Sequence, residues 1–128
     1  MGALPDLAVQ LLDGNAFWVL STVNADGSPQ SSVIWAKRDG DEILFSSVRG
    51  GRKTRNIERD PRVSLVVVDP ANPYRYVEVR GTVSMTEEGG RELIDELSVK
   101  YTGHSYTSDG PDAVRVVFRI TPTHVVGR

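Results

Sequence analysis

Short β-rich runs separated by turn signals are the feature that most restricts how this chain can fold. The first run, from Phe17 to Leu20, ends at the turn Asn24-Ala25-Asp26-Gly27. A second run, from Ser31 to Ala36, leads to Asp39-Gly40 and then to a third run, Ile43-Leu44-Phe45. Turns of this composition join neighbouring antiparallel strands. We therefore predict that the first three strands form a meander.

Three later runs have the composition and periodicity of strands. Val63 to Val68 is almost unbroken and β-branched, which is typical of a strand buried on both faces. Apolar and polar residues alternate from Tyr76 to Met85 and again from Val114 to Ile120. The strands lead into hairpins and not into regular βαβ repeats. The prediction is a mainly β fold, a closed or partly closed antiparallel barrel of about six strands, as a single domain over residues 1–128.

Three segments predict helices at the margins of this barrel. Apolar residues recur at helical spacing from Leu4 to Leu12, and Gly14 can end that helix. A short exposed helix is expected after Gly50-Gly51, where the strand pattern breaks. Thr86 can cap a third helix, whose apolar stripe reaches Tyr101. The polar segment 102–112 is predicted to be a loop.

Composition excludes several classes of function. A net charge of −2 gives no whole-molecule attraction for nucleic acid or membranes, so any anion site must be local. The absence of cysteine excludes disulfides, thiolate nucleophiles and Cys-type metal sites, and His104 and His124 lack metal-ligand spacing. No apolar run approaches the ~20 residues that span a bilayer. Residues 1–6 lack the features of a signal peptide, so we expect a soluble, cytoplasmic protein.

Positive charge is concentrated in one segment, residues 49–62. It carries six cations and two acids, a local charge of +4, so the rest of the chain carries −6. The cations are Arg49, Arg52, Lys53, Arg55, Arg59 and Arg62. A glycine pair entering a helix among cationic side chains combines three anion-binding devices, and phosphate is the obvious ligand. A solvated helix face with arginines paired to nearby acids would have the same composition.

Four short motifs together resemble a known family. Ser28-Pro29-Gln30-Ser31 opens the second strand and Phe45-Ser46-Ser47 closes the third. Lys53-Thr54-Arg55-Asn56-Ile57 and Asp60-Pro61-Arg62 follow. In this order they resemble the pyridoxamine-5′-phosphate-oxidase-like split β-barrels, the FMN-binding split-barrel type, over nearly the whole chain. Within that group the last two motifs resemble the flavin/deazaflavin oxidoreductases of the branch that uses coenzyme F420.

The resemblance implies a homodimer with a cofactor in each of two clefts at the subunit interface. Lys53, with Thr54 and either Arg49 or Arg52, would hold the cofactor phosphate. The backbone of residues 32–35 would run beside the rings, residues 46 and 47 would bond the linker, and residues 74–76 would come from the partner subunit. The implied cofactor-binding residues are Ser32, Val33, Ile34, Trp35, Ser46, Ser47, Arg49, Arg52, Lys53, Thr54 and Tyr76.

Several aromatic residues have both a structural and a functional interpretation. Trp18 has only apolar neighbours and is predicted to lie in the core. Trp35 could be core or could line a ring pocket. Tyr76 could reach a ligand through its hydroxyl or be an ordinary cross-strand tyrosine. His104 to Tyr106, in the late loop, could cover a substrate.

The favoured function is an F420H2-dependent oxidoreductase that transfers a hydride between coenzyme F420 and a small unsaturated or quinone-like molecule. The cofactor performs such chemistry, so no catalytic side chain is required, and none is predicted. The alternatives are an FMN-dependent oxidase or reductase on the same barrel and a non-enzymatic carrier or sensor of the cofactor. A nucleic-acid module using the basic segment is disfavoured by the overall acidity and by the lack of an aromatic stacking array.

Overall fold

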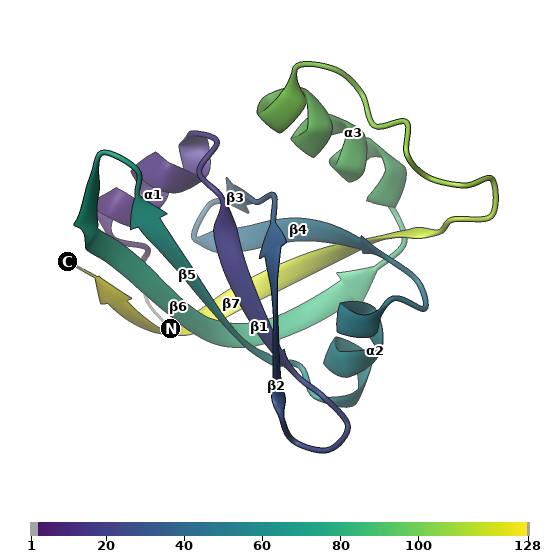
Figure 1. The fold of residues 1–128 in the computed structure, drawn as a ribbon, viewed down its shortest axis with the longest axis horizontal. Helices are drawn as coiled ribbons and strands as arrows, with labels where there is room; N and C mark the ends of the chain where they lie inside the picture. The colour runs from purple at the N-terminus through teal and green to yellow at the C-terminus, as the bar shows by residue number, and fades with distance from the viewer. Residues whose placement is uncertain (1–2, 128) are drawn as a thin grey trace.

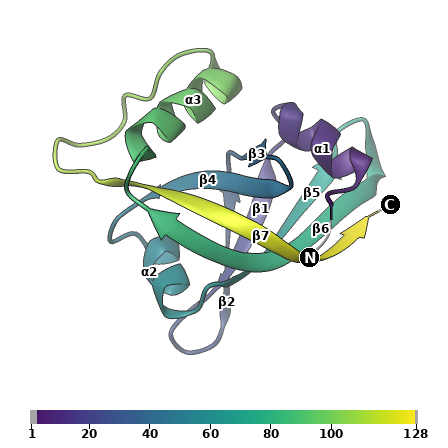
Figure 2. The same cartoon turned by 180° about the vertical axis from the view of Figure 1, so that it is seen from behind.

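A computed structural model describes residues 3–127, and residues 1, 2 and 128 lie outside it. Seven antiparallel strands form one curled sheet with three helices at its margins (Figures 1 and 2). The strands are β1 (Trp18–Val23), β2 (Pro29–Ile34), β3 (Lys37–Asp39), β4 (Glu42–Val48), β5 (Arg62–Asp69), β6 (Asn72–Thr86) and β7 (Arg115–Gly127). The helices are α1 (Asp6–Asp13), α2 (Arg52–Arg59) and α3 (Gly90–Thr102).

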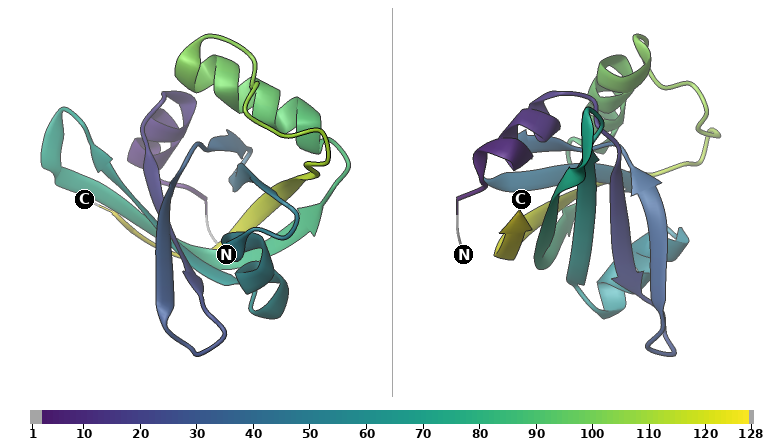
Figure 3. Two further views of the ribbon diagram at one scale, coloured as in Figure 1. Left: turned by 45° about the vertical axis from the view of Figure 1, so that its right-hand side comes forward. Right: turned by 60° about the vertical axis from the view of Figure 1, so that its left-hand side comes forward.

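The predicted mainly β split barrel is confirmed, with the short strand β3 added to the six predicted strands. In every view α1 and α3 lie at one end of the curled sheet and α2 at the other (Figure 3). No helix within residues 3–127 is long and apolar enough to cross a membrane.

The strand order places two consecutive strands at opposite margins of the sheet. The order is β2-β1-β5-β6-β7-β4-β3, so the chain crosses from one margin to the other at Trp35 and Ala36. The predicted meander of the first three strands is therefore wrong. β1 and β2 form a hairpin, but Phe45 of β4 is in register with Phe118 of β7 and not with any residue of β2. A turn signal specifies hairpin partners only, and this long-range pairing decides how the barrel closes.

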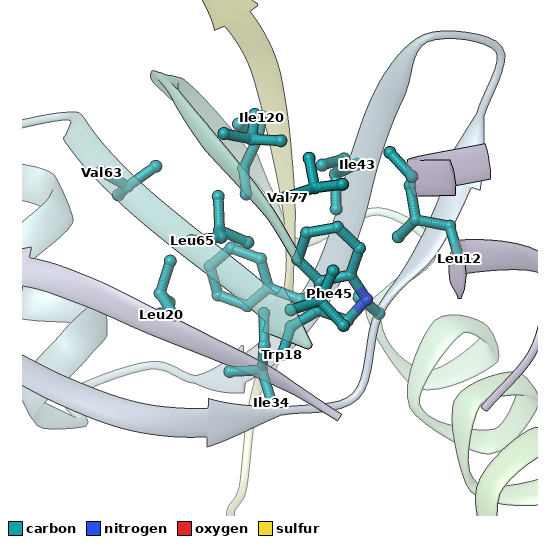
Figure 4. Close-up of a cluster of buried hydrophobic side chains, with 14 of the residues drawn as sticks. Leu12, Trp18, Leu20, Ile34, Ile43, Phe45, Val63, Leu65, Val77 and Ile120 are labelled. Carbon is teal, nitrogen blue, oxygen red and sulfur yellow. The ribbon is translucent and has the colours of Figure 1, made fainter. Parts of the chain in front are cut away.

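The core fills the inside of the curl. Trp18, Phe45 and Phe118 are fully buried, which confirms the prediction for Trp18. The rings of Phe45 and Phe118 stack with their centres 4.6 Å apart. Figure 4 shows side chains of β1, β4, β5 and β6 converging, with Leu12 of α1 at the edge of the cluster. α1 thus contributes its apolar stripe to the barrel core, as predicted from its spacing.

β5 corrects the prediction of burial on both faces. Val63, Leu65 and Val67 are buried in the core, but the alternate residues point outward, and Val68 is 47% exposed. The unbroken β-branched run therefore supplies the core with one face and leaves an apolar outer face open. The alternation predicted for β6 is confirmed, with Val77 and Val79 buried.

Two helices differ from their predicted form. α2 is short, as expected, but it is not wholly exposed, because Thr54, Asn56 and Ile57 are buried against the barrel. α3 begins at Gly90, so the prediction of a start at Thr86 is wrong: Thr86 is in register with Val117 as the last residue of β6. Gly90 lies so close to the Arg115 carbonyl group that a Cβ would overlap it. This contact fixes the start of α3 against the start of β7.

Candidate functional site

A small pocket lies where the end of β2, the middle of β4, the start of α2 and the start of β7 meet. Its volume is about 190 Å³. Its lining residues are Val33, Ile34, Trp35, Ser46, Lys53, Ile94, Leu97, Tyr106 and Arg115. Five of these nine residues belong to the predicted cofactor-binding set: Val33, Ile34, Trp35, Ser46 and Lys53.

Lys53 is the cation that the local sequence places in this pocket. It is the second residue of α2, and this helix begins directly after the glycine pair Gly50-Gly51. Burial and the neighbouring Arg115 lower the pKa of Lys53 below its ordinary value of 10.5, and no acid among its described neighbours opposes them. A partly buried cation without a counter-charge is costly on its own. An anion in the pocket would remove that cost.

Arg115 is the second cation of the pocket, and it was not predicted as a site residue. Its guanidinium donates from Nε and Nη2 to the two oxygens of Asp109 at 2.9 and 2.8 Å. Its Nη1 lies 3.4 Å from the hydroxyl oxygen of Ser46, which also lines the pocket. Register places Arg115 opposite Val48 at the end of β4, next to the entry to α2. Because that pairing is long-range, no local sequence signal could have identified it.

The two arginines expected to assist Lys53 lie elsewhere. Arg49 is ion-paired with Glu58 at 2.9 Å and with Glu87 at 2.8 Å. Arg52 lines a separate, open pocket of about 480 Å³ together with Arg55 and Arg59 of the same helix. The paired-arginine interpretation thus describes Arg49, whereas Lys53 and Arg115 form the partly enclosed pair of cations.

The remaining predicted polar residues differ in whether their side chains can reach a ligand in this pocket. Thr54 is fully buried, and its hydroxyl donates to the Val48 carbonyl oxygen at 2.6 Å, so it fixes the entry to α2. Ser47 packs near Gly51 outside the pocket lining. The Ser32 hydroxyl is buried and, within residues 3–127, has no hydrogen-bond partner. Tyr76 is in register with Val68 on the outer face of the sheet and does not line this pocket.

The aromatic residues close one side of the pocket. Trp35 stacks on Tyr101 of α3 at 5.5 Å, and its edge meets Tyr106 at 6.2 Å. Trp35 therefore packs under α3 and also lines this pocket, whereas a role beside the cofactor rings stays a prediction. Tyr106 comes from the late loop, so part of this loop reaches the pocket, whereas His104 is exposed and does not line it. Coverage of a substrate by this loop stays a prediction.

Fold and pocket together define a class: a small split β-barrel with a cationic pocket of about 190 Å³ at the entry to a helix. Residues 4–127 match the family model described as pyridoxamine 5′-phosphate oxidase. The chain therefore belongs to the pyridoxamine 5′-phosphate oxidase family, and the resemblance inferred from its motifs is confirmed.

Individual relatives refine this assignment. A solved F420 reductase is 34% identical, with a TM-score of 0.85 over 96% of this chain and 98% of that one. A conserved hypothetical protein of Mycobacterium tuberculosis is 24% identical, with a TM-score of 0.79 over 98% of this chain and 84% of that one, and supports the fold alone. The pyridoxine/pyridoxamine 5′-phosphate oxidase of Rubrobacter xylanophilus is 37% identical over 83 residues, 64% of this chain but only 37% of that relative. The family model and the F420 reductase, which this chain covers almost completely, support an oxidoreductase with a flavin-type cofactor.

Proposed function

We propose that this protein is an F420H2-dependent oxidoreductase that transfers a hydride between coenzyme F420 and a small unsaturated organic substrate. The observation that carries the proposal is the pair of cations, Lys53 and Arg115, that line one pocket. The 34% identity to an F420 reductase over nearly the full length of both chains favours the deazaflavin over other cofactors.

The volume of the pocket limits which part of the cofactor it holds. Pockets for whole drug-sized ligands measure about 300–1,000 Å³, whereas this one measures about 190 Å³. The space fits a phosphate and the adjoining linker, with Ser46 and Nη1 of Arg115 as donors beside Lys53. The rings would then lie outside it, along Val33, whose side chain is 62% exposed.

The residues of this chain would bind and orient the cofactor. When bound, the deazaflavin supplies the hydride chemistry, so the protein needs donors and a shaped surface more than an acid or base. Lys53 would hold the charge of the phosphate, and the hydroxyl of Ser46, which also lines the pocket, would offer a further polar contact on β4.

A second copy of the chain would complete the cleft. Val33, Val19 and Val66 are in register across β2, β1 and β5, and they form one apolar row on the outer face of the sheet. Phe17 and Val68 extend this row, and both are exposed. Val33 belongs to the row and also lines the pocket, so the apolar face continues to the cofactor site. We propose a homodimer through this outer face, which would bring residues 74–76 of the partner subunit toward the rings.

The dimer predicts a clear response to charge on that face. Val19→Lys would place an ammonium group in the apolar row, and it is expected to convert the protein to a monomer and to weaken cofactor binding. Analytical ultracentrifugation measures the first effect and fluorescence titration the second. Val99→Lys is the control, because Val99 is 53% exposed on α3, outside the row. A wild-type protein that sediments as a monomer contradicts the proposed interface.

Titration with both cofactors tests the proposed function. Coenzyme F420 is expected to bind in the micromolar range and more tightly than FMN, and bound F420H2 should be oxidised by a quinone-like acceptor. Tighter binding of FMN than of F420 would overturn the proposal in favour of an FMN-dependent enzyme on the same barrel. Binding of F420 with no oxidation by any acceptor tested would make the protein a carrier or sensor.

A further inference from the structure

Ion pairs and hydrogen bonds hold the loop between α3 and β7 against the pocket. Arg91 of α3 lies 3.3 Å from Asp109 and 3.2 Å from Asp95. Its guanidinium also donates to the Tyr106 carbonyl oxygen at 2.6 Å, and the Tyr106 amide donates to Asp95 at 3.1 Å. The loop backbone is thereby held at two points, and Asp109 is carried to the start of β7.

This network ends on the guanidinium of Arg115. Asp109 accepts from Nε and Nη2 in the bidentate geometry that fixes the plane of a guanidinium. The guanidinium carbon of Arg115 lies over the ring of Tyr106, 4.7 Å from the ring centre. Arg115 and Asp109 each have only 11% of the side chain exposed. Nη1, the remaining nitrogen, is the one nearest to Ser46 in the pocket.

We propose that Asp109 is a positioning residue of the anion pocket, which acts by fixing Arg115 so that Nη1 stays turned toward Ser46 in the pocket that Lys53 also lines. The inference rests on the proposed function, in which a phosphate occupies this pocket. An arginine has many rotamers, and two neighbouring cations repel each other, so an untethered Arg115 would turn away from Lys53. Asp109 removes that freedom before the ligand arrives, which is how outer residues improve a binding site.

Asp109→Asn tests this role with inorganic phosphate as the probe. The amide keeps the shape of the side chain, but it replaces one acceptor oxygen with a donor facing the guanidinium, so the bidentate contact is lost. We expect the affinity for phosphate, measured by NMR titration, to fall about tenfold, the lower end of the loss seen when a residue that orients a metal ligand is replaced. Asp109→Glu keeps the carboxylate and should retain more of the affinity. Unchanged or tighter binding by Asp109→Asn would overturn the proposal.

A double-mutant cycle separates positioning from a structural role. In an Arg115→Gln background the guanidinium is absent, so the further change Asp109→Asn should leave phosphate affinity unaltered. Equal losses in both backgrounds would show that Asp109 supports the loop alone, and would also overturn the proposal. Thermal unfolding of each variant identifies any that is unfolded, and Asp109→Glu then provides the measurement.

Two further variants complete the design. Asp13 binds Arg38 through the same two nitrogens, at 2.7 and 2.9 Å, outside the pocket lining. Asp13→Asn is therefore the matched control, and its phosphate affinity should equal that of the wild type. Lys53→Ala distinguishes the two proposals. If it leaves phosphate affinity unchanged, the proposed function fails; if it abolishes binding while the cycle is additive, only the role of Asp109 fails.

Discussion

Lys53→Ala is expected to weaken binding of the phosphate-bearing cofactor between about 10- and 100-fold. A hydrogen bond to a charged group contributes about 1.5–3 kcal/mol, which corresponds to this range because about 1.4 kcal/mol is a factor of ten. Lys53 supplies such a bond from a partly buried position without a counter-charge among its described neighbours. Fluorescence titration of F420 and FMN gives the two dissociation constants directly.

The control for this variant lies on the same helix. Arg55→Ala removes the same charge from α2, but Arg55 faces the separate open pocket, so its affinity for the cofactor should match that of the wild type. Equal cofactor affinities of the wild type, Lys53→Ala and Arg55→Ala would show that Lys53 does not bind the cofactor.

The pH profile provides an independent readout for Lys53. Burial and Arg115 lower the pKa of Lys53, so its proton is lost below the ordinary value of 10.5. Wild-type affinity should therefore fall as pH rises through the lowered pKa, and this step should be absent in Lys53→Ala. In the empty protein the sign is opposite: stability should rise with pH between the lowered pKa and 10.5, because there the unfolded chain binds more protons.

Phe45→Ala is expected to lower the free energy of unfolding by about 3–5 kcal/mol, the usual cost of removing a buried phenyl ring. Phe45 is 0% exposed. Its ring stacks at 4.6 Å on Phe118, its partner in the pairing of β4 with β7. A domain of this size has about 5–15 kcal/mol in total, so the variant should be marginally folded. Urea denaturation at low temperature measures the change.

Urea denaturation of a surface variant provides the reference for the loss of unfolding free energy in Phe45→Ala. Val99→Ala removes apolar atoms from a side chain that is 53% exposed on α3, so it should change the free energy of unfolding by less than about 0.5 kcal/mol. If Phe45→Ala costs no more than Val99→Ala, the ring is not in the core of the folded protein. A large loss for Phe45→Ala would support the β4–β7 pairing on which the pocket depends.

The sequence predicted the kinds of elements well and their pairing poorly. Alternation over Tyr76 to Met85 and helical spacing over Leu4 to Leu12 are local signals, and both elements form where expected. The partner of β4 is not a local property. Ile43-Leu44-Phe45 follows the Asp39-Gly40 turn as a hairpin strand should, but that hairpin is made with the three-residue strand β3. The main partner, β7, is decided by closure of the barrel.

The same limit applies to the candidate site. The motif around Lys53 was informative because the glycine pair, the helix start and the lysine are adjacent in sequence. Whether an arginine is free depends on distant residues: Arg49 is paired with Glu87, which is 38 residues away. Arg115 reaches the pocket through strand pairing alone, so composition gave no reason to select it. A site residue that belongs to a local motif, such as Lys53, could therefore be predicted from the sequence. A residue that reaches the pocket only through long-range strand pairing, such as Arg115, could not.

The pairing of β4 with β7 also has a consequence for biosynthesis. Chains emerge from the ribosome with the N-terminus first, so the edge of β4 that pairs Ser46 with Val117 stays open until β7 has been made, even though the other edge can already pair with β3. Until then both β4 and β6 expose edges that can bind other chains, and Lys53 has no Arg115 beside it. The nascent chain can thus complete the candidate pocket only when β7, the last strand within residues 3–127, has been released.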